Sequence, residues 1–182
     1  MTGPTLDSWL PRAAVRTEQR RAASTAPDSL WAAAGSIRLA DTRRLGRMVR
    51  WRIPGLDGAL RYHEMFRTYP FVVLEESACG LVSGLCGRIW TLARDYPALA
   101  DASEFAGWAE PGTVRVAFHH RAFAVDGGAE IVSEARVEPV DTRARLRLKA
   151  VWAVLGPFAH LVASEPLELA ARRAEGERQL RQ

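Results

Sequence analysis

The spacing of hydrophobic and polar positions predicts one strand and two short helices in the first third of the chain. A dense run of charged and polar residues over 15–23 predicts a strand with one exposed face. Thr25 or Asp28 can cap a helix that ends at Gly35. A second helix is predicted to start at Asp41 and to end before the next Pro-Gly pair. The residues expected to face the core are Leu30, Trp31, Ala34, Leu45, Met48 and Val49.

Two hairpins follow, because the pattern changes to β-branched and alternating residues. Tight turns are predicted at 78–80 and at Asp126-Gly127-Gly128. Gly84 and Gly87 indicate a bulge or bend inside the second strand of the first hairpin. The four expected strands are 71–77, 81–90, 114–125 and 130–137.

Pairing across the second turn assigns the faces of that hairpin, because cross-strand partners point to the same side. The apolar set of the outgoing strand then meets the apolar set of the return strand, which places His120 inward and His119 outward. Arg121 and Glu134 are expected to lie near each other on the outer face. Glu75 and Glu76 point to opposite faces, and the pattern does not decide which of them is buried.

A long helix is predicted to close the fold, with Asp141 as its cap. Gly156-Pro157 is expected to break or kink it and Pro166 to interrupt it, before it ends near Arg178. Its apolar stripe consists of Ala144, Leu148, Val151, Trp152 and Leu155. This helix belongs to a single domain that we expect over 14–176. An N-terminal arm over 1–13 and a frayed tail over 177–182 are expected on either side of the domain. The sequence does not decide whether the connection 95–111 forms a lid.

Composition narrows the class of protein more than its activity. The 182 residues are 48% hydrophobic and 25% charged, which is typical of one soluble domain. No apolar stretch is long enough for a membrane span and no secretory leader is recognisable, so we expect no integral membrane association and a cytoplasmic location. Basic residues exceed acidic ones by only four, and the arginine runs are interleaved with apolar residues, which favours solvated helix and strand faces over nucleic-acid binding.

Motifs for catalysis or metal binding are incomplete. Arg67 stands where a zinc-protease helix starting at His63 needs its second histidine. Cys79 and Cys86 lack further ligands at matching spacing, so no metal site is expected and both are interpreted as small buried apolar residues. No cofactor-binding motif is found. A lone inward His120 is more often a hydrogen-bonded core residue than a catalyst.

The order of strand, two helices, curved antiparallel strands and long helix resembles the helix-grip domains of the SRPBCC superfamily (START-like, birch-allergen-like), within a polyketide cyclase-like or uncharacterised branch. The resemblance covers about 15–175. The segments that carry it are 26–31, 37–41, 70–76, 84–90 and 133–137, with Trp152 and 157–158 on the last helix.

The resemblance implies an α+β fold in which a six- or seven-stranded sheet wraps around the C-terminal helix and leaves an internal cavity. Such cavities bind lipids, polyketides or other hydrophobic small molecules. With the faces assigned above, the expected lining is Phe118, His120, Ser133, Ala135, Val151 and Trp152. The alternative is a cyclase or dehydratase that uses the same pocket, with His120 or a buried glutamate as proton shuttle. The sequence does not decide between binding and turnover, and it leaves the ligand and the oligomeric state open.

Overall fold

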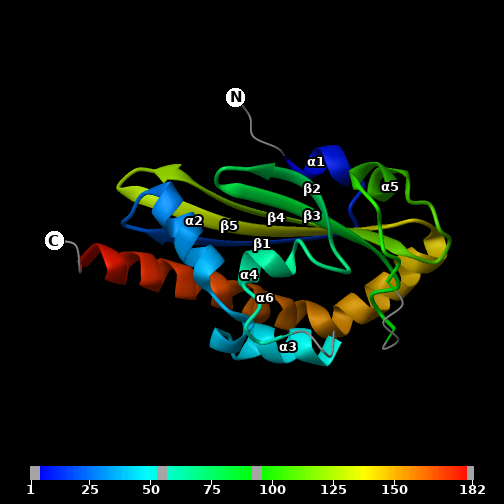
Figure 1. Ribbon diagram of the computed structural model, residues 1–182. Coiled ribbons are helices and arrows are strands. Elements are labelled where there is room, and N and C mark those ends of the chain that lie inside the picture. Colours follow the sequence, from blue (N-terminus) through cyan, green and yellow to red (C-terminus); the bar gives the residue numbers. More distant parts are fainter. Residues whose placement is uncertain (1–4, 53–56, 92–95, 180–182) are drawn as a thin grey trace.

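The computed structural model describes residues 5–52, 57–91 and 96–179, and it has the α+β helix-grip architecture that the sequence predicts. A curved antiparallel sheet lies on one side of a long C-terminal helix (Figure 1). In the described residues the sheet has five strands in the order β1-β5-β4-β3-β2, so the six or seven strands implied by the resemblance are wrong. The strands are β1 (Val15–Ala23), β2 (Val72–Ser77), β3 (Gly80–Gly87), β4 (Val114–Val125) and β5 (Gly128–Pro139).

Helices cover both faces of the sheet. The inner face packs against α2, α4 and α6, while α1 and α5 pack on the outer face, and α3 lies against α6 on the side away from the sheet (Figure 1). The helical elements are α1 (Leu6–Trp9), α2 (Pro27–Ser36), the 3-10 helix η1 (Leu39–Asp41), α3 (Arg44–Arg52), α4 (Tyr62–Met65), α5 (Ala102–Gly107) and α6 (Thr142–Gln179). The sequence predicted α2, α3 and α6, whereas the three short helices and η1 were missed.

The hairpin registers follow from their two-residue turns. Ser77 pairs with Gly80 and Val125 with Gly128, so each turn has two central residues. The bulge lies in β2, between Val73 and Glu75, rather than in the glycine-containing partner strand where it was expected. Gly84 instead makes room for the Phe105 side chain, because a Cβ added at this position would lie 2.5 Å from the Phe105 ring.

Helix α6 is continuous over 38 residues, so the pause expected at Pro166 is wrong, and of the break or kink expected at 156–157 the break is wrong. A proline inside a helix removes one amide donor and crowds the preceding turn, which can bend the helix without ending it. Figure 1 shows that α6 bends along its length. It also continues to Gln179, inside the expected tail 177–182.

The caps of α2 and α3 differ from the predicted ones. Ala26 is the N-cap of α2 and provides no side-chain hydrogen bond, so neither Thr25 nor Asp28 caps this helix. The Glu165 carboxylate of α6 accepts hydrogen bonds from the first amides of α3, at 2.8 Å from Arg43 and Arg44 and 3.0 Å from Leu45. A residue 120 positions away therefore fixes α3 to α6, which no local pattern could indicate.

Burial of Leu6 and Leu10 shows that the N-terminal arm has a structural role. Both side chains are fully buried in a cluster on the outer face of the sheet. Every residue of β3 is buried, because this strand packs on both faces. The outer cluster consists of Leu6, Leu10, Leu74, Val82, Cys86, Phe105 and Ala117.

Candidate functional site

The middle of the inner face is more accessible to solvent than the positions beside it. Phe118 on the central strand β4 pairs with Ser83 on β3 and Ala135 on β5, and both Phe118 and Ala135 are partly exposed. On the same face of β4, Val116 is 5% exposed and His120 is 2% exposed. Protein interiors are close-packed, so partial exposure in the centre of a covered sheet face indicates space between the sheet and the helices.

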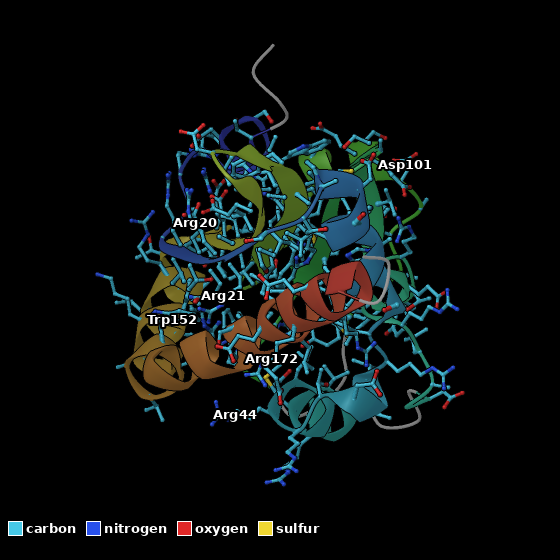
Figure 2. All side chains as sticks on the ribbon, turned by 90° about the vertical axis from the view of Figure 1, so that its left-hand side faces the viewer. Arg20, Arg21, Arg44, Asp101, Trp152 and Arg172 are labelled. Carbon is cyan, nitrogen blue, oxygen red and sulfur yellow. The ribbon has the colours of Figure 1, made fainter. Side chains whose placement is uncertain are left out.

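Apolar side chains from several elements surround this position. Phe71 and Val73 of the β2 edge are partly exposed and pack against the same inner core. Trp152 of α6 is also partly exposed and packs against the cluster that Phe118 joins at the other end of the sheet. Figure 2 shows Trp152 on α6 at one side of the molecule, with Asp101, the N-cap of α5, at the other. The accessible surface of the inner face is therefore bordered by apolar side chains from the sheet and from α6.

Aromatic rings from α4 close one end of this surface. The ring of Phe66 lies 5.1 Å from Phe71, 5.2 Å from Phe118 and 4.3 Å from His120, measured between centroids. Tyr62 lies edge-on to His120 at 5.3 Å. Offset and edge-on contacts are the preferred geometries for such rings, so this end of the inner face is a rigid wall.

A short chain of polar groups lies within this wall. Tyr62 Oη is 3.4 Å from His120 Nδ1, and the Ser133 hydroxyl lies near enough to Tyr62 to influence its pKa. Burial raises the pKa of Tyr62, which the Ser133 hydroxyl only partly offsets, and burial lowers the pKa of His120 well below its usual value. Both groups are therefore uncharged near neutral pH.

Two buried polar atoms beside Phe118 have no hydrogen-bond partner. They are Ser83 Oγ and His120 Nε2, and no described residue satisfies either. Ser83 is the cross-strand neighbour of Phe118, and His120 lies two positions along β4 on the same face. An unpaired buried polar atom costs about 1–3 kcal/mol, so such atoms call for a physical reason.

The structure brings together most of the residues that the sequence predicted for the site. Phe118, His120, Ser133 and Ala135 lie on neighbouring positions of β4 and β5, and Val151 and Trp152 lie partly exposed on α6. The sequence missed Tyr62, Phe66, Phe71, Val73 and Ser83. Ser83 had a usable signal, since it is a polar residue within an apolar strand.

The two candidate glutamates point to opposite faces of β2, and Glu76 is the one on the inner face, at the edge of the sheet. Glu75 pairs with Val82, whose side chain is on the outer face, and accepts a hydrogen bond from Trp9 Nε1 of α1. Glu76 is half exposed and forms an ion pair with Arg67. Neither carboxylate is buried beside His120.

The outer face differs from its expected solvated state. His119 is buried there at 3% exposure, and burial lowers its pKa to about 4. Glu134 pairs with Arg136 rather than with Arg121, whose guanidinium lies 5.4 Å from the Phe123 ring centre. Arg136 also pairs with Asp7 of α1, so the ion pairs of this face hold the N-terminal segment in place.

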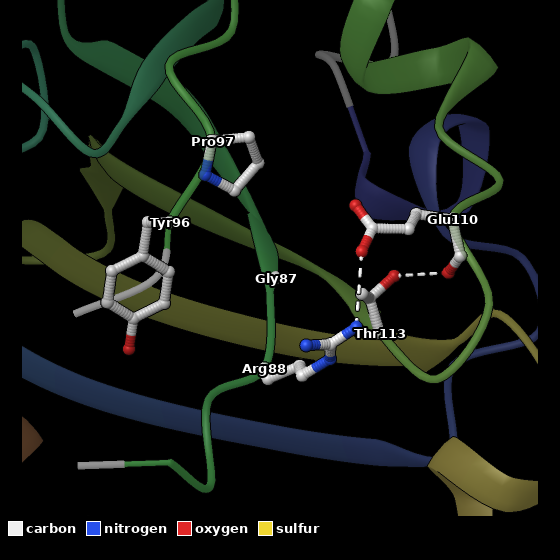
Figure 3. Close-up of a pocket in the computed structure, with 6 residues that line it drawn as sticks. All are labelled: Gly87, Arg88, Tyr96, Pro97, Glu110 and Thr113. Carbon is white, nitrogen blue, oxygen red and sulfur yellow. Dashed lines mark hydrogen bonds and ion pairs between the residues drawn. The ribbon is translucent and has the colours of Figure 1, made fainter. Parts of the chain in front are cut away.

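A small polar cavity of about 110 Å³ lies at the end of β3 (Figure 3). An ion pair between Arg88 and Glu110 crosses its rim at 3.3 Å. The other lining residues are Gly87, Tyr96, Pro97 and Thr113. The connection that contributes to this cavity also carries α5, whose Phe105 is fully buried on the outer face.

The cysteines differ from each other. Cys86 is fully buried, and burial raises its pKa to about 12, which makes its thiol unreactive. Cys79 is only partly buried, which corrects the expectation for this residue, and its thiol donates a hydrogen bond to Asp28. The described residues hold no group of three His, Cys, Asp or Glu side chains that could bind a metal ion. In the same residues, no helix has the length and apolar character needed to cross a bilayer.

Comparisons with known proteins find weak structural similarity to solved structures and no match in sequence. The sequence matches no protein-family model and no curated protein. The solved structure of TTHA0849 from Thermus thermophilus is 10% identical, with 90% of this chain and 99% of that chain covered at a TM-score of 0.35. For Ara h 8.0201 the identity is 13%, the coverage is 88% and 97%, and the TM-score is 0.27. At these values neither similarity indicates a function.

Proposed function

We propose that the protein binds a hydrophobic small molecule between the inner face of its sheet and α6. The observation that carries this proposal is the partial exposure of Phe118 and Ala135 in the middle of a covered sheet face, next to unpaired polar atoms. Apolar surface that solvent reaches inside a fold is favourable to cover with an apolar ligand.

The polar atoms indicate which ligand would fit. If Ser133 donates to Tyr62 Oη, the Tyr62 hydroxyl can donate to His120 Nδ1, and the proton of the neutral imidazole then resides on Nε2. His120 Nε2 and the Ser83 hydroxyl would both offer donors to one uncharged oxygen, such as a carbonyl. A charged head group is disfavoured, because burial already keeps His120 neutral.

The sequence resemblance supports the same class of ligand. Lipid- or polyketide-like molecules are apolar and carry carbonyl or hydroxyl oxygens, and the helix-grip architecture matches the fold of the SRPBCC superfamily. We therefore propose membership of that superfamily together with the binding function.

The electrostatics favour binding over proton transfer. A cyclase or dehydratase would need His120 or a nearby glutamate as a shuttle, with a pKa near the working pH. Burial moves the pKa values of His120 and Tyr62 away from neutrality in opposite directions. Glu75 lies on the outer face, and Glu76 is half exposed at the edge of the sheet in an ion pair with Arg67, so an enzymatic interpretation has no buried carboxylate beside the imidazole.

Filling the space in front of Phe118 is expected to weaken binding strongly. We expect Ala135→Trp to weaken binding of the neutral fluorescent probe N-phenyl-1-naphthylamine at least about tenfold, because the indole would occupy the apolar surface. Fluorescence titration measures this, with Ala22→Trp on the exposed part of β1 as the matched control. Native mass spectrometry of the gently purified protein tests for a bound hydrophobe in parallel.

A second variant separates ligand recognition from folding. Ser83→Ala removes an unsatisfied hydroxyl, so the free energy of unfolding should stay equal or rise. Its affinity for an apolar ketone probe such as 2-nonanone should nevertheless fall about fivefold or more. Equal probe binding by the parent protein and Ala135→Trp, with both folded, would refute the site.

A further inference from the structure

The first half of α6 presents an unusual outward face. Its buried side is ordinary, with Ala144 and Leu148 at 0% and 1% exposure in the core. On the opposite side, Leu146 is 64% exposed and Val154 is 66% exposed, among the most exposed large apolar side chains described. Single exposed apolar residues are common, but these two belong to one helix face.

Helical geometry gathers the exposed apolar residues into a stripe. Successive residues turn by about 100°, so Leu146, Ala150 and Ala153 project within about 60° of one another, and Val154 lies beside them. All four are exposed. We call this set the α6 stripe.

Cations flank the stripe on both sides. By the same rotation, Arg145 and Lys149 lie along one edge, while Arg147 lies along the other. These three side chains are exposed and form no ion pair with a described carboxylate. The sequence has no Asp or Glu from 142 to 164. A helix face that is merely solvated usually alternates the sign of its charges, which this one does not.

Helix α3 also presents exposed cations together with an exposed apolar side chain. Helix α3 packs against α6 on the side away from the sheet (Figure 1). Met48, which the sequence placed inward, is 41% exposed, and it follows the exposed Arg44 by one helical turn. Figure 2 shows Arg44 at the margin of the molecule, below Arg172 of α6. The Glu165 carboxylate that faces the start of α3 is already engaged with three amides.

We propose that the α6 stripe and its flanking cations dock the protein onto a lipid bilayer that contains anionic lipids. An amphipathic helix lies in the interface when its apolar side chains enter the acyl boundary and its cations reach the phosphates. Each Arg or Lys near an anionic surface adds attraction, and exposed Leu146 and Val154 supply the apolar part. Nucleic acid would leave the apolar centre of the stripe without a role. The proposal is independent of the ligand site, because none of these side chains faces the sheet.

Vesicle flotation tests this surface. Purified protein is mixed with vesicles of phosphatidylcholine alone, or of phosphatidylcholine and phosphatidylglycerol in equal parts. We expect binding to the anionic vesicles only, weakening as salt is raised. Removing two cations in Arg147→Gln/Lys149→Gln should lower the partition coefficient about tenfold or more. Leu146→Asp/Val154→Asp should lower it at least as far, because it replaces the two large apolar side chains with negative charges that the anionic surface repels.

Two controls make the result decisive. Arg12→Gln/Arg16→Gln removes the same net charge at two exposed sites near α1, on the other side of the sheet from α6, so it should retain near-parent binding. Val125→Asp changes an exposed apolar residue at the β4–β5 turn and should also retain it. Thermal unfolding confirms that each variant is folded. The proposal is overturned if anionic vesicles are not bound, if both charge variants lose binding equally, or if a nucleic-acid duplex competes fully with the vesicles.

Discussion

Lowering the pH from about 7 to about 5 is expected to remove about 2 kcal/mol of folding stability for each of three buried histidines. Burial lowers the pKa values of His63 and His119 to about 4 and that of His120 well below 6.5. In the unfolded chain these rings take up a proton near pH 6.5, whereas the folded protein keeps them neutral. The unfolded state then binds more protons, so stability falls as the pH drops below 6.5.

Charged neighbours modify these shifts but do not reverse them. Arg67 lowers and Glu76 raises the pKa of His63, while Arg121 lowers and Glu75 raises that of His119. For His120 the other two histidines add to the effect of burial. The combined loss approaches the whole stability of a typical domain, which is about 5–15 kcal/mol.

Urea unfolding at a series of pH values measures the effect. The slope of unfolding free energy against pH gives the number of protons taken up, and His119→Gln should reduce it by about one proton. Carboxylates with lowered pKa values, such as Asp41 and Asp141, respond only below about pH 4 and do not confound this window. Constant stability between pH 7 and pH 5 would contradict the burial of uncharged histidines.

Local patterns were sufficient to predict the strands and the pairing within each of the two hairpins. The β4–β5 hairpin could be predicted because its alternation and its two-residue turn specify the same register. The outer layer could not be predicted in this way, because the helical spacing of Leu6, Trp9 and Leu10 covers little more than one turn. The near-continuous apolar run of β3 was nevertheless a signal that both faces of the sheet are covered.

The candidate site was predictable only where it depends on this register. His120 and Ser133 are cross-strand partners, so the hairpin placed them together. Tyr62 lies 58 positions from His120 and meets it through the packing of α4, for which the sequence shows no pattern. The interruption expected in α6 failed for a related reason, because contacts along the helix outweigh the local cost of proline.

Phe105→Ala is expected to lower the free energy of unfolding by about 3–5 kcal/mol. The ring is fully buried between α5 and the outer face of the sheet, beside Leu6 and Val82. The Phe105 ring fits there because residue 84 is a glycine. A Cβ added at Gly84 would lie 2.5 Å from Phe105 Cε2 and 2.7 Å from Phe105 Cδ2. Gly84→Ala alone should therefore cost about 1–3 kcal/mol, because the ring must move. Chemical denaturation measures both losses.

The double variant distinguishes this contact from a general weakening of the outer layer. Once Phe105 is alanine, the clash at Gly84 is gone, so Gly84→Ala should cost much less in that background than in the parent. Phe123→Ala serves as the control, since this ring lies partly exposed on the same face of β4 and should cost about 1 kcal/mol or less. Additive losses for the two substitutions would mean that Phe105 does not press on Gly84. In that case the glycine would instead serve the backbone of β3 itself.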